Sequence, residues 1–207
     1  MKLPFRKVEI AGKEKFFLFR RFRKLVTFVP AEHAETLIAG LAKQGAGVIG
    51  NYDSCSFRSS GIGTFRPNSK ASPYSGRKNA LSEEPESRLE MQCHDEDLNN
   101  VINALLNIHP YEEVAYEVYE FIKRDTESCG EVITLKKPMS ILNIISRLNR
   151  RIHSPEGAED LMCRKIAVTE ERGSEELLES ARIAGCDAMV IFAGESKLII
   201  KPITYNI

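Results

Sequence analysis

Residues 24–30 read KLVTFVP, an alternating stretch rich in valine and phenylalanine that predicts a β-strand. Pro30 then opens a helix predicted over residues 31–44, with leucine and isoleucine along one face. After this strand and helix come two further strands, and then a second helix followed by a last strand. The further predicted elements are an extended stretch from Gly45 towards Phe57, a glycine-rich reversal at 60–63 back to Phe65, a strand at 87–94, a helix at 96–108 and a strand at 114–122.

The predicted order over residues 24–122 is β-α-β-β-α-β, the order of a ferredoxin-like domain. Such a domain is an antiparallel four-stranded sheet with both helices on one face, so the predicted fold class is α+β. Residues 67–87 interrupt the pattern with a polar loop in which three prolines disfavour regular structure. A loop of this length in a compact domain is often functional or mobile.

A second segment follows a polar linker predicted at 123–130. Its expected elements are an extended stretch at 131–135, a helix at 141–152 capped by Ser140, a strand at 164–169, a helix at 175–184 capped by Ser174, a buried strand at 187–193 in a parallel pair and a strand at 197–203. Residues 131–207 therefore predict a partial α/β segment. A segment of about 80 residues has a small core, so we expect it to pack on another part of the protein.

The N-terminal segment, residues 1–23, is basic and aromatic. Residues 1–24 hold nine lysines and arginines against two glutamates, with five phenylalanines among them. Such a composition suits an acidic membrane surface, single-stranded nucleic acid or a transit peptide, although serine is absent. We favour a short hairpin, Lys7–Ile10 with Lys15–Phe19, that packs its phenylalanines on the body, because leaving them solvated is costly.

Composition limits the function classes. The 207 residues fit one large domain or two of about 100 residues each. The 29 basic and 29 acidic side chains cancel, so we expect no nucleic-acid partner for the whole chain. No run of 18 apolar residues is present, so no membrane span is expected. Five widely spaced cysteines without a C-x-x-C pattern predict reduced thiols in a cytoplasmic protein.

Three stretches carry a resemblance to a known family: KLVTFVPAEH from Lys24, GAGVIGNYDSCSFRSSGIGTFRP from Gly45 and HPYEEVAYEVYEF from His109. In this order and spacing they resemble the inserted domain of the Nif-three-like family, also described as homologues of GTP cyclohydrolase type 2. The resemblance implies a ferredoxin-like insert similar to the trimeric CutA proteins. Residues 130–195 resemble, more weakly, the segments that follow the insert in that family.

The resemblance also implies a dinuclear metal centre, which this sequence does not complete. In the family, the ligands come from a paired-histidine motif in an N-terminal domain and from a histidine and a glutamate near the C-terminus. Here the four histidines include no adjacent pair, and Ile199 stands where a family motif has histidine, eight residues before the last residue. We therefore expect a truncated member without metal or cofactor, although the family implies two divalent ions.

Two clusters supply the candidate ligand-binding residues, which are His109, Tyr111, Glu112 and Glu113 in one and Asn51, Tyr52 and Cys55 in the other. An imidazole beside carboxylates can bind a ligand or transfer protons, but the alternative is that His109 caps its helix and its neighbours fix the next corner. The second cluster, with the glycines at 61 and 63, is a candidate rim of a ligand site. The alternative is that the glycines only permit a sharply twisted hairpin. No catalytic residue is assigned.

Two function classes remain open. In the first, which the missing ligands favour, the chain is a non-catalytic module that forms a homo-oligomer, based on a trimer of residues 24–122, and binds a small molecule or a protein partner. In the second, which the resemblance implies, it is a metal-dependent hydrolase of a nucleotide-like or phosphorylated substrate. A decayed gene product is a third reading.

Overall fold

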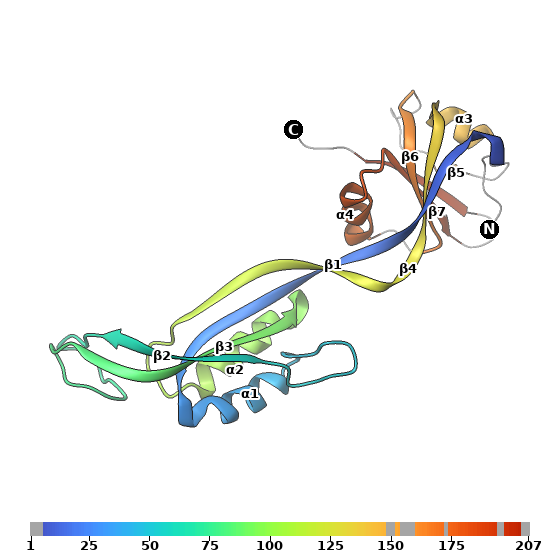
Figure 1. Cartoon of the computed structure of the whole chain (residues 1–207). Coiled ribbons are helices and arrows are strands. Elements are labelled where there is room, and N and C mark those ends of the chain that lie inside the picture. Colours follow the sequence, from blue (N-terminus) through green and yellow to red (C-terminus); the bar gives the residue numbers. More distant parts are fainter. Residues whose placement is uncertain (1–5, 148–151, 154–159, 172–173, 194–196, 204–207) are drawn as a thin grey trace. The chain divides into compact units, whose positions relative to one another are not determined.

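A computed structural model describes residues 6–147, 152–153, 160–171, 174–193 and 197–203 and shows a mixed α+β fold, as predicted (Figure 1). The strands are β1 (Ile10–Pro30), β2 (Phe57–Phe65), β3 (Ser82–His94), β4 (Tyr116–Ser140), β5 (Ile152–His153), β6 (Met162–Thr169), β7 (Ala188–Ala193) and β8 (Lys197–Pro202). The helices are α1 (Ala34–Ala42), α2 (Leu98–Ile108), α3 (Ile141–Ser146) and α4 (Glu175–Ile183), with 3-10 turns η1 (Lys7–Glu9), η2 (Ala31–His33) and η3 (Asp95–Asp97).

Two compact units divide the chain. The central unit runs from Arg21 to Ile122, and the terminal unit comprises the residues up to Arg20 and those from Lys123 onward. Strands β1 and β4 contribute residues to both units. The basic N-terminal residues therefore fold with the C-terminal strands and helices.

In the central unit the strands are ordered β2-β3-β1-β4. Strand β3 is antiparallel both to β1, with Leu25 opposite Met91, and to β2, with Gly61 opposite Glu86. Helices α1 and α2 lie side by side against the strands (Figure 1). The core between helices and strands is formed by buried aliphatic residues, among them Leu25, Val29, Leu37, Leu41, Leu89, Met91, Val101 and Leu105.

Strand β2 differs from the prediction. The glycine-rich tract was expected to reverse the chain at 60–63, but β2 runs straight through Gly61 and Gly63, neither of which has a positive φ. The chain turns earlier, at Gly45, Gly47 and Gly50, whose φ values are +93°, +78° and +59°. Positive φ is the conformation that glycine adopts without strain, so the turns fall at these glycines and the later ones stay extended.

In the terminal unit, β6 and β7 form the parallel pair that the apolar run at 187–193 predicted, and β8 is antiparallel to β7. Both predicted helix caps are confirmed: the Ser140 hydroxyl accepts from Asn143 N–H and the Ser174 hydroxyl accepts from Leu177 N–H. Helix α3 ends at Ser146, before its predicted end at 152; residues 148–151 lie outside the described part.

The linker predicted at 123–130 is wrong, because β4 continues through these residues. Their polar side chains match basic residues of β1. Arg20 binds Asp125 at 3.1 Å, and directly after this stretch Glu131 binds Lys13 at 3.0 Å. Opposite charges on neighbouring strands stabilise pairing in the way that apolar pairs do elsewhere. No residue of this stretch is fully buried, so it lacks the apolar alternation by which strands are recognised.

The hairpin predicted for the N-terminal segment is also wrong. Strand β1 begins at Ile10 and passes through Gly12 without turning. Its phenylalanines do pack on the body, as expected: Phe16 is 1% exposed and lies in a core cluster with Leu177 and Met189. The Phe17 ring lies 4.3 Å from the Arg124 guanidinium. The predicted small core of the C-terminal segment is therefore completed by the N-terminal strand.

His109 occupies a buried corner after α2. Its Nδ1 accepts a hydrogen bond from Tyr111 N–H at 3.2 Å, so its Nε2 carries the hydrogen and donates to Phe28 O at 3.0 Å. Burial lowers the pKa of His109, against a smaller opposing effect of the Phe28 carbonyl. Protonation of Nδ1 would remove the acceptor that Tyr111 N–H uses.

We predict that Phe16→Ala lowers the free energy of unfolding by about 3 kcal/mol or more, because it leaves a cavity in a packed core. Phe17→Ala, the same change on the neighbouring and more exposed residue, is the matched control and should cost much less. Urea unfolding followed by circular dichroism measures both. Equal losses would contradict the inward packing of Phe16.

We predict that His109 makes stability pH-dependent. Because its folded-state pKa lies below the ordinary value near 6.5, its contribution is complete above about pH 6.5 and declines as the pH falls. His109→Gln should reduce the loss of stability between about pH 7.5 and pH 5.5, measured by urea unfolding. His94→Gln, at a half-buried histidine that ends β3, serves as the control, and an unchanged pH profile in His109→Gln would refute the prediction.

Candidate functional site

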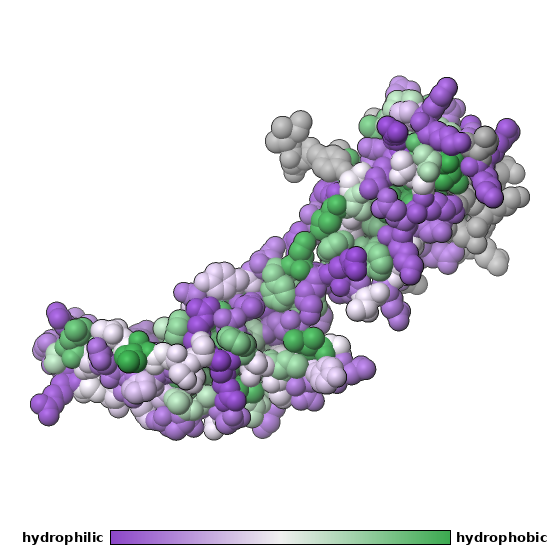
Figure 2. Space-filling model, in the orientation of Figure 1, coloured by the Kyte–Doolittle hydropathy of each residue, from purple (hydrophilic) through white to green (hydrophobic). Residues whose placement is uncertain are grey.

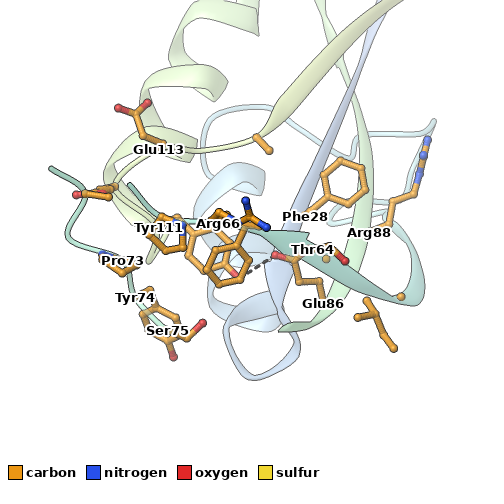
Figure 3. Close-up of a pocket in the computed structure, with 18 of the residues that line it drawn as sticks. Phe28, Thr64, Arg66, Pro73, Tyr74, Ser75, Glu86, Arg88, Tyr111 and Glu113 are labelled. Carbon is orange, nitrogen blue, oxygen red and sulfur yellow. Dashed lines mark hydrogen bonds between the residues drawn. The ribbon is translucent and has the colours of Figure 1, made fainter. Parts of the chain in front are cut away.

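A cavity of about 780 Å³ lies in the central unit (Figure 3). Parts of β1, β2 and β3 line it, together with the loop 66–81, here called the strap, and the corner 109–115. The lining side chains used below are Phe28, Arg66, Tyr74, Glu86, Arg88, Tyr111, Glu112 and Glu113.

Glycines of β2 form one wall of the cavity. Gly61 pairs with Glu86 across the β2–β3 ladder, and residues directly opposite each other project from the same face of a sheet. A Cβ on Gly63 would overlap the Glu86 carboxylate, which confirms that this is the shared face. A Cβ on Gly61 would meet nothing within 4 Å. The missing side chain at Gly61 therefore leaves open space beside a cavity residue.

Aromatic rings form a second wall. The Tyr74 and Tyr111 ring centroids are 5.7 Å apart, and Tyr111 OH donates to Glu86 Oε1 at 2.8 Å (dashed in Figure 3). Burial, with this hydrogen bond to Glu86, raises the pKa of Tyr111. The phenol therefore stays protonated at neutral pH, and serves to fix Glu86.

The strap is held over the cavity by hydrogen bonds to three glutamates. Tyr74 OH donates to Glu32 Oε1 at 3.2 Å, and the His33 ring lies beside the same hydroxyl. Ser72 N–H donates to Glu112 Oε1 at 2.8 Å, and the Ser75 hydroxyl donates to Glu84. These hydrogen bonds fix the position of the strap, although its sequence is polar.

Cationic side chains around the cavity differ in their partners. Arg88 binds Glu90 at 3.0 Å and lies over the Phe28 ring, with 5.9 Å between guanidinium and centroid. Arg58 of β2 binds Glu35 at 2.7 Å. Arg66, in contrast, has no hydrogen-bond or ion-pair partner among the described residues. It lines the cavity together with Tyr111, Thr64 and Phe28 (Figure 3).

The structure brings only one predicted cluster to this cavity. Tyr111, Glu112 and Glu113 line it, and His109 lies behind Tyr111, with 5.0 Å between the ring centroids. The residues of the other predicted cluster do not line it; they are Asn51, Tyr52 and Cys55, in the turns before β2. The proposed role of every one of these residues stays a prediction.

Sequence reasoning missed Phe28, Arg66 and Glu86. They stand in three separate segments that only the β1–β3 and β2–β3 registers bring together. The one local signal was the spacing of Gly61 and Gly63, which leaves two successive positions on one strand face without side chains.

No group of three or more histidine, cysteine, aspartate or glutamate side chains within the described ranges could hold a metal ion. None of the helices that the structure describes is long and apolar enough to cross a membrane.

Comparison with known proteins identifies curated relatives named "GTP cyclohydrolase 1 type 2 homolog". The chain is 36% identical to that of Bacillus subtilis over 173 residues and 32% identical to that of Halalkalibacterium halodurans over 172 residues. Each alignment covers 81% of this chain and 46% of the relative. The chain thus spans less than half the length of these relatives. No family model matches it.

Among solved structures, a Bacillus cereus protein related to NIF3 is similar at 27% identity and a TM-score of 0.47, over 94% of this chain and 56% of that one. CutA from Synechococcus elongatus is similar at 19% identity and a TM-score of 0.36, over 56% of this chain and 87% of CutA. The curated relatives and the motifs agree on the family. The chain belongs to the Nif-three-like family of GTP cyclohydrolase 1 type 2 homologues.

Proposed function

We propose that the chain is a non-catalytic binding module that holds a small organic molecule in the cavity of its central unit. The observation that carries this proposal is the open space above Gly61, inside a cavity of about 780 Å³. Ligand pockets in proteins are of this order of size, with apolar and aromatic walls and a few placed polar groups. Glycine within a strand weakens it, and often marks a close approach by a ligand.

The polar groups of the cavity support binding more than proton transfer. The Tyr111 hydroxyl is held by Glu86 and has a raised pKa, so it is a hydrogen-bond donor at neutral pH. The Ser75 hydroxyl donates a hydrogen bond to the Glu84 carboxylate. An activated nucleophile requires a neighbouring base that accepts its proton, and a carboxylate bound in this way is a weak base.

We predict that Gly61→Leu weakens binding of small aromatic probes by about tenfold or more, since the new side chain enters the open space. The probes are three naphthalenes of different charge: naphthoate, naphthamide and naphthylmethylammonium. Calorimetric titration of the full chain gives the dissociation constants. Gly12→Leu is the matched control, because Gly12 also lies in a strand and its Cβ would meet nothing within 4 Å.

Unchanged binding in Gly61→Leu would contradict the proposal, as would the failure of all three probes to bind the wild-type chain. Metal analysis of the same purified protein tests the hydrolase alternative. Two tightly held divalent ions per chain would contradict the non-catalytic role and favour a metal-dependent hydrolase.

We also propose that the chain self-associates as a trimer-based homo-oligomer. In the described strand order β2 has a neighbour on one side only, β3. Two apolar side chains on this strand are strongly exposed, Phe57 at 63% and Ile62 at 70%. Apolar areas appear among the polar surface where β2 and β3 extend (Figure 2). An exposed edge strand of this kind, whose single charged residue Arg58 is paired with Glu35, is a site for pairing with another copy.

We predict a mass by light scattering of three times the 23.3 kDa of one chain, or a multiple of that. Ile62→Lys should lower the mass towards that of one chain, because a lysine on an edge strand opposes strand pairing. Leu81→Lys, which changes an equally exposed residue outside the strands, is the control. A monomeric wild-type chain would contradict self-association.

Two further inferences complete the proposed role. We infer that residues 24–122 form a ferredoxin-like domain, supported by the strand order β2-β3-β1-β4 and by two helices packed on one core. We also infer a cytoplasmic location, supported by the five cysteines, which form no disulfide bond. Burial raises the pKa of the Cys93, Cys163 and Cys186 thiols to about 11, which keeps them protonated and unreactive.

A further inference from the structure

The cavity combines an aromatic wall, a wall of strand backbone without side chains and one cationic group that no neighbour neutralises. We propose that its ligand is a planar aromatic anion, with its ring against the aromatic wall and its carboxylate or phosphate on the Arg66 guanidinium. This inference rests on the proposed function, namely that the cavity binds a small molecule, and adds the chemical class of that molecule.

The planar shape follows from the two walls. Tyr74 and Tyr111 present ring surfaces from the strap and the corner, and Phe28 presents another from β1. On β2, the face that Gly61 shares with Glu86 is open, because a Cβ on Gly61 would meet nothing within 4 Å, whereas the Glu86 carboxylate covers Gly63. A flat ring can therefore lie close to the strand backbone while it stacks on the aromatic residues.

The negative charge follows from the pairing of the charged side chains. Arg88 and Arg58 are each neutralised by a glutamate, whereas Arg66 has no such partner in the described part of the chain. Arginine offers a planar fork of donors that suits a carboxylate or a phosphate. Arg66, Tyr111 and Phe28 all line this one cavity (Figure 3), so one ligand inside it can reach both the guanidinium and the rings.

The glutamates of the cavity do not offer an equivalent site for a cation. Glu86 accepts from Tyr111 OH, and Glu112 accepts from Ser72 N–H. Glu113 is an exposed side chain, and Figure 3 shows it directed away from Arg66. A ligand placed between the rings therefore meets a free cation, while Glu86 and Glu112 already accept hydrogen bonds.

The test compares the three naphthalene probes, which share a ring system and differ in charge. Naphthoate should bind the full wild-type chain about tenfold more tightly than naphthamide, and naphthylmethylammonium should bind most weakly. Arg66→Gln should bring the naphthoate-to-naphthamide ratio close to one. Arg77→Gln, an exposed strap arginine that does not line the cavity, should leave the ratio unchanged. Added salt should reduce the preference in the wild type.

The outcomes separate this inference from the proposed function. If all three probes bind equally, and Gly61→Leu abolishes their binding, the cavity is a binding site but the anion preference is wrong. The inference is likewise overturned if Arg66→Gln keeps the wild-type ratio, or if the cationic probe binds most tightly. If no probe binds the wild-type chain, both the proposed function and this inference fail.

Discussion

The pairing of β2 with β3 is the constraint on which the candidate site depends. This register places Gly61 opposite Glu86 and Ser59 opposite Arg88, while β1 on the other side of β3 places Phe28 opposite Arg88. A shift of β2 by one residue would turn Ile62 and Ser60 to the cavity face and remove the space beside Gly61. The glycines, the anchored Glu86 and the aromatic wall thus form one arrangement.

Charge pairing along β1 has a comparable role for the rest of the chain. The local excess of lysine and arginine near the N-terminus is matched within each unit by acidic residues. Lys13 and Arg20 bind carboxylates of β4 in the terminal unit, and Lys24 binds Glu90 in the central unit at 3.0 Å. Exposed pairs of this kind contribute little singly, but they give the long strands a preferred register. The basic segment therefore carries less free charge than its composition suggests.

Sequence patterns predicted the helices, their serine caps and the buried parallel pair, because each of these leaves a local signal in a few neighbouring residues. They failed for β1 and β4, where residues 123–130 look like a linker although they form a strand. In that stretch cross-strand ion pairs replace apolar alternation. The residues of the candidate site likewise fall into a group that the local sequence reveals and a group that it does not. Tyr111, Glu112 and Glu113 were recognisable as a local cluster, whereas Phe28, Arg66 and Glu86 are brought together only by pairing between distant segments.

The continuity of β1 and β4 has a consequence for how the protein can be divided. The central unit begins and ends within strands, near Arg21 and Ile122, and no loop marks either boundary. Expressing the central unit alone would cut both β1 and β4 within the strand and would leave their backbone groups at the cut ends without the rest of the strand. The terminal unit is discontinuous in the gene, so its two portions must both be translated before its core can close. During synthesis on the ribosome, the central unit is therefore expected to fold before the terminal unit.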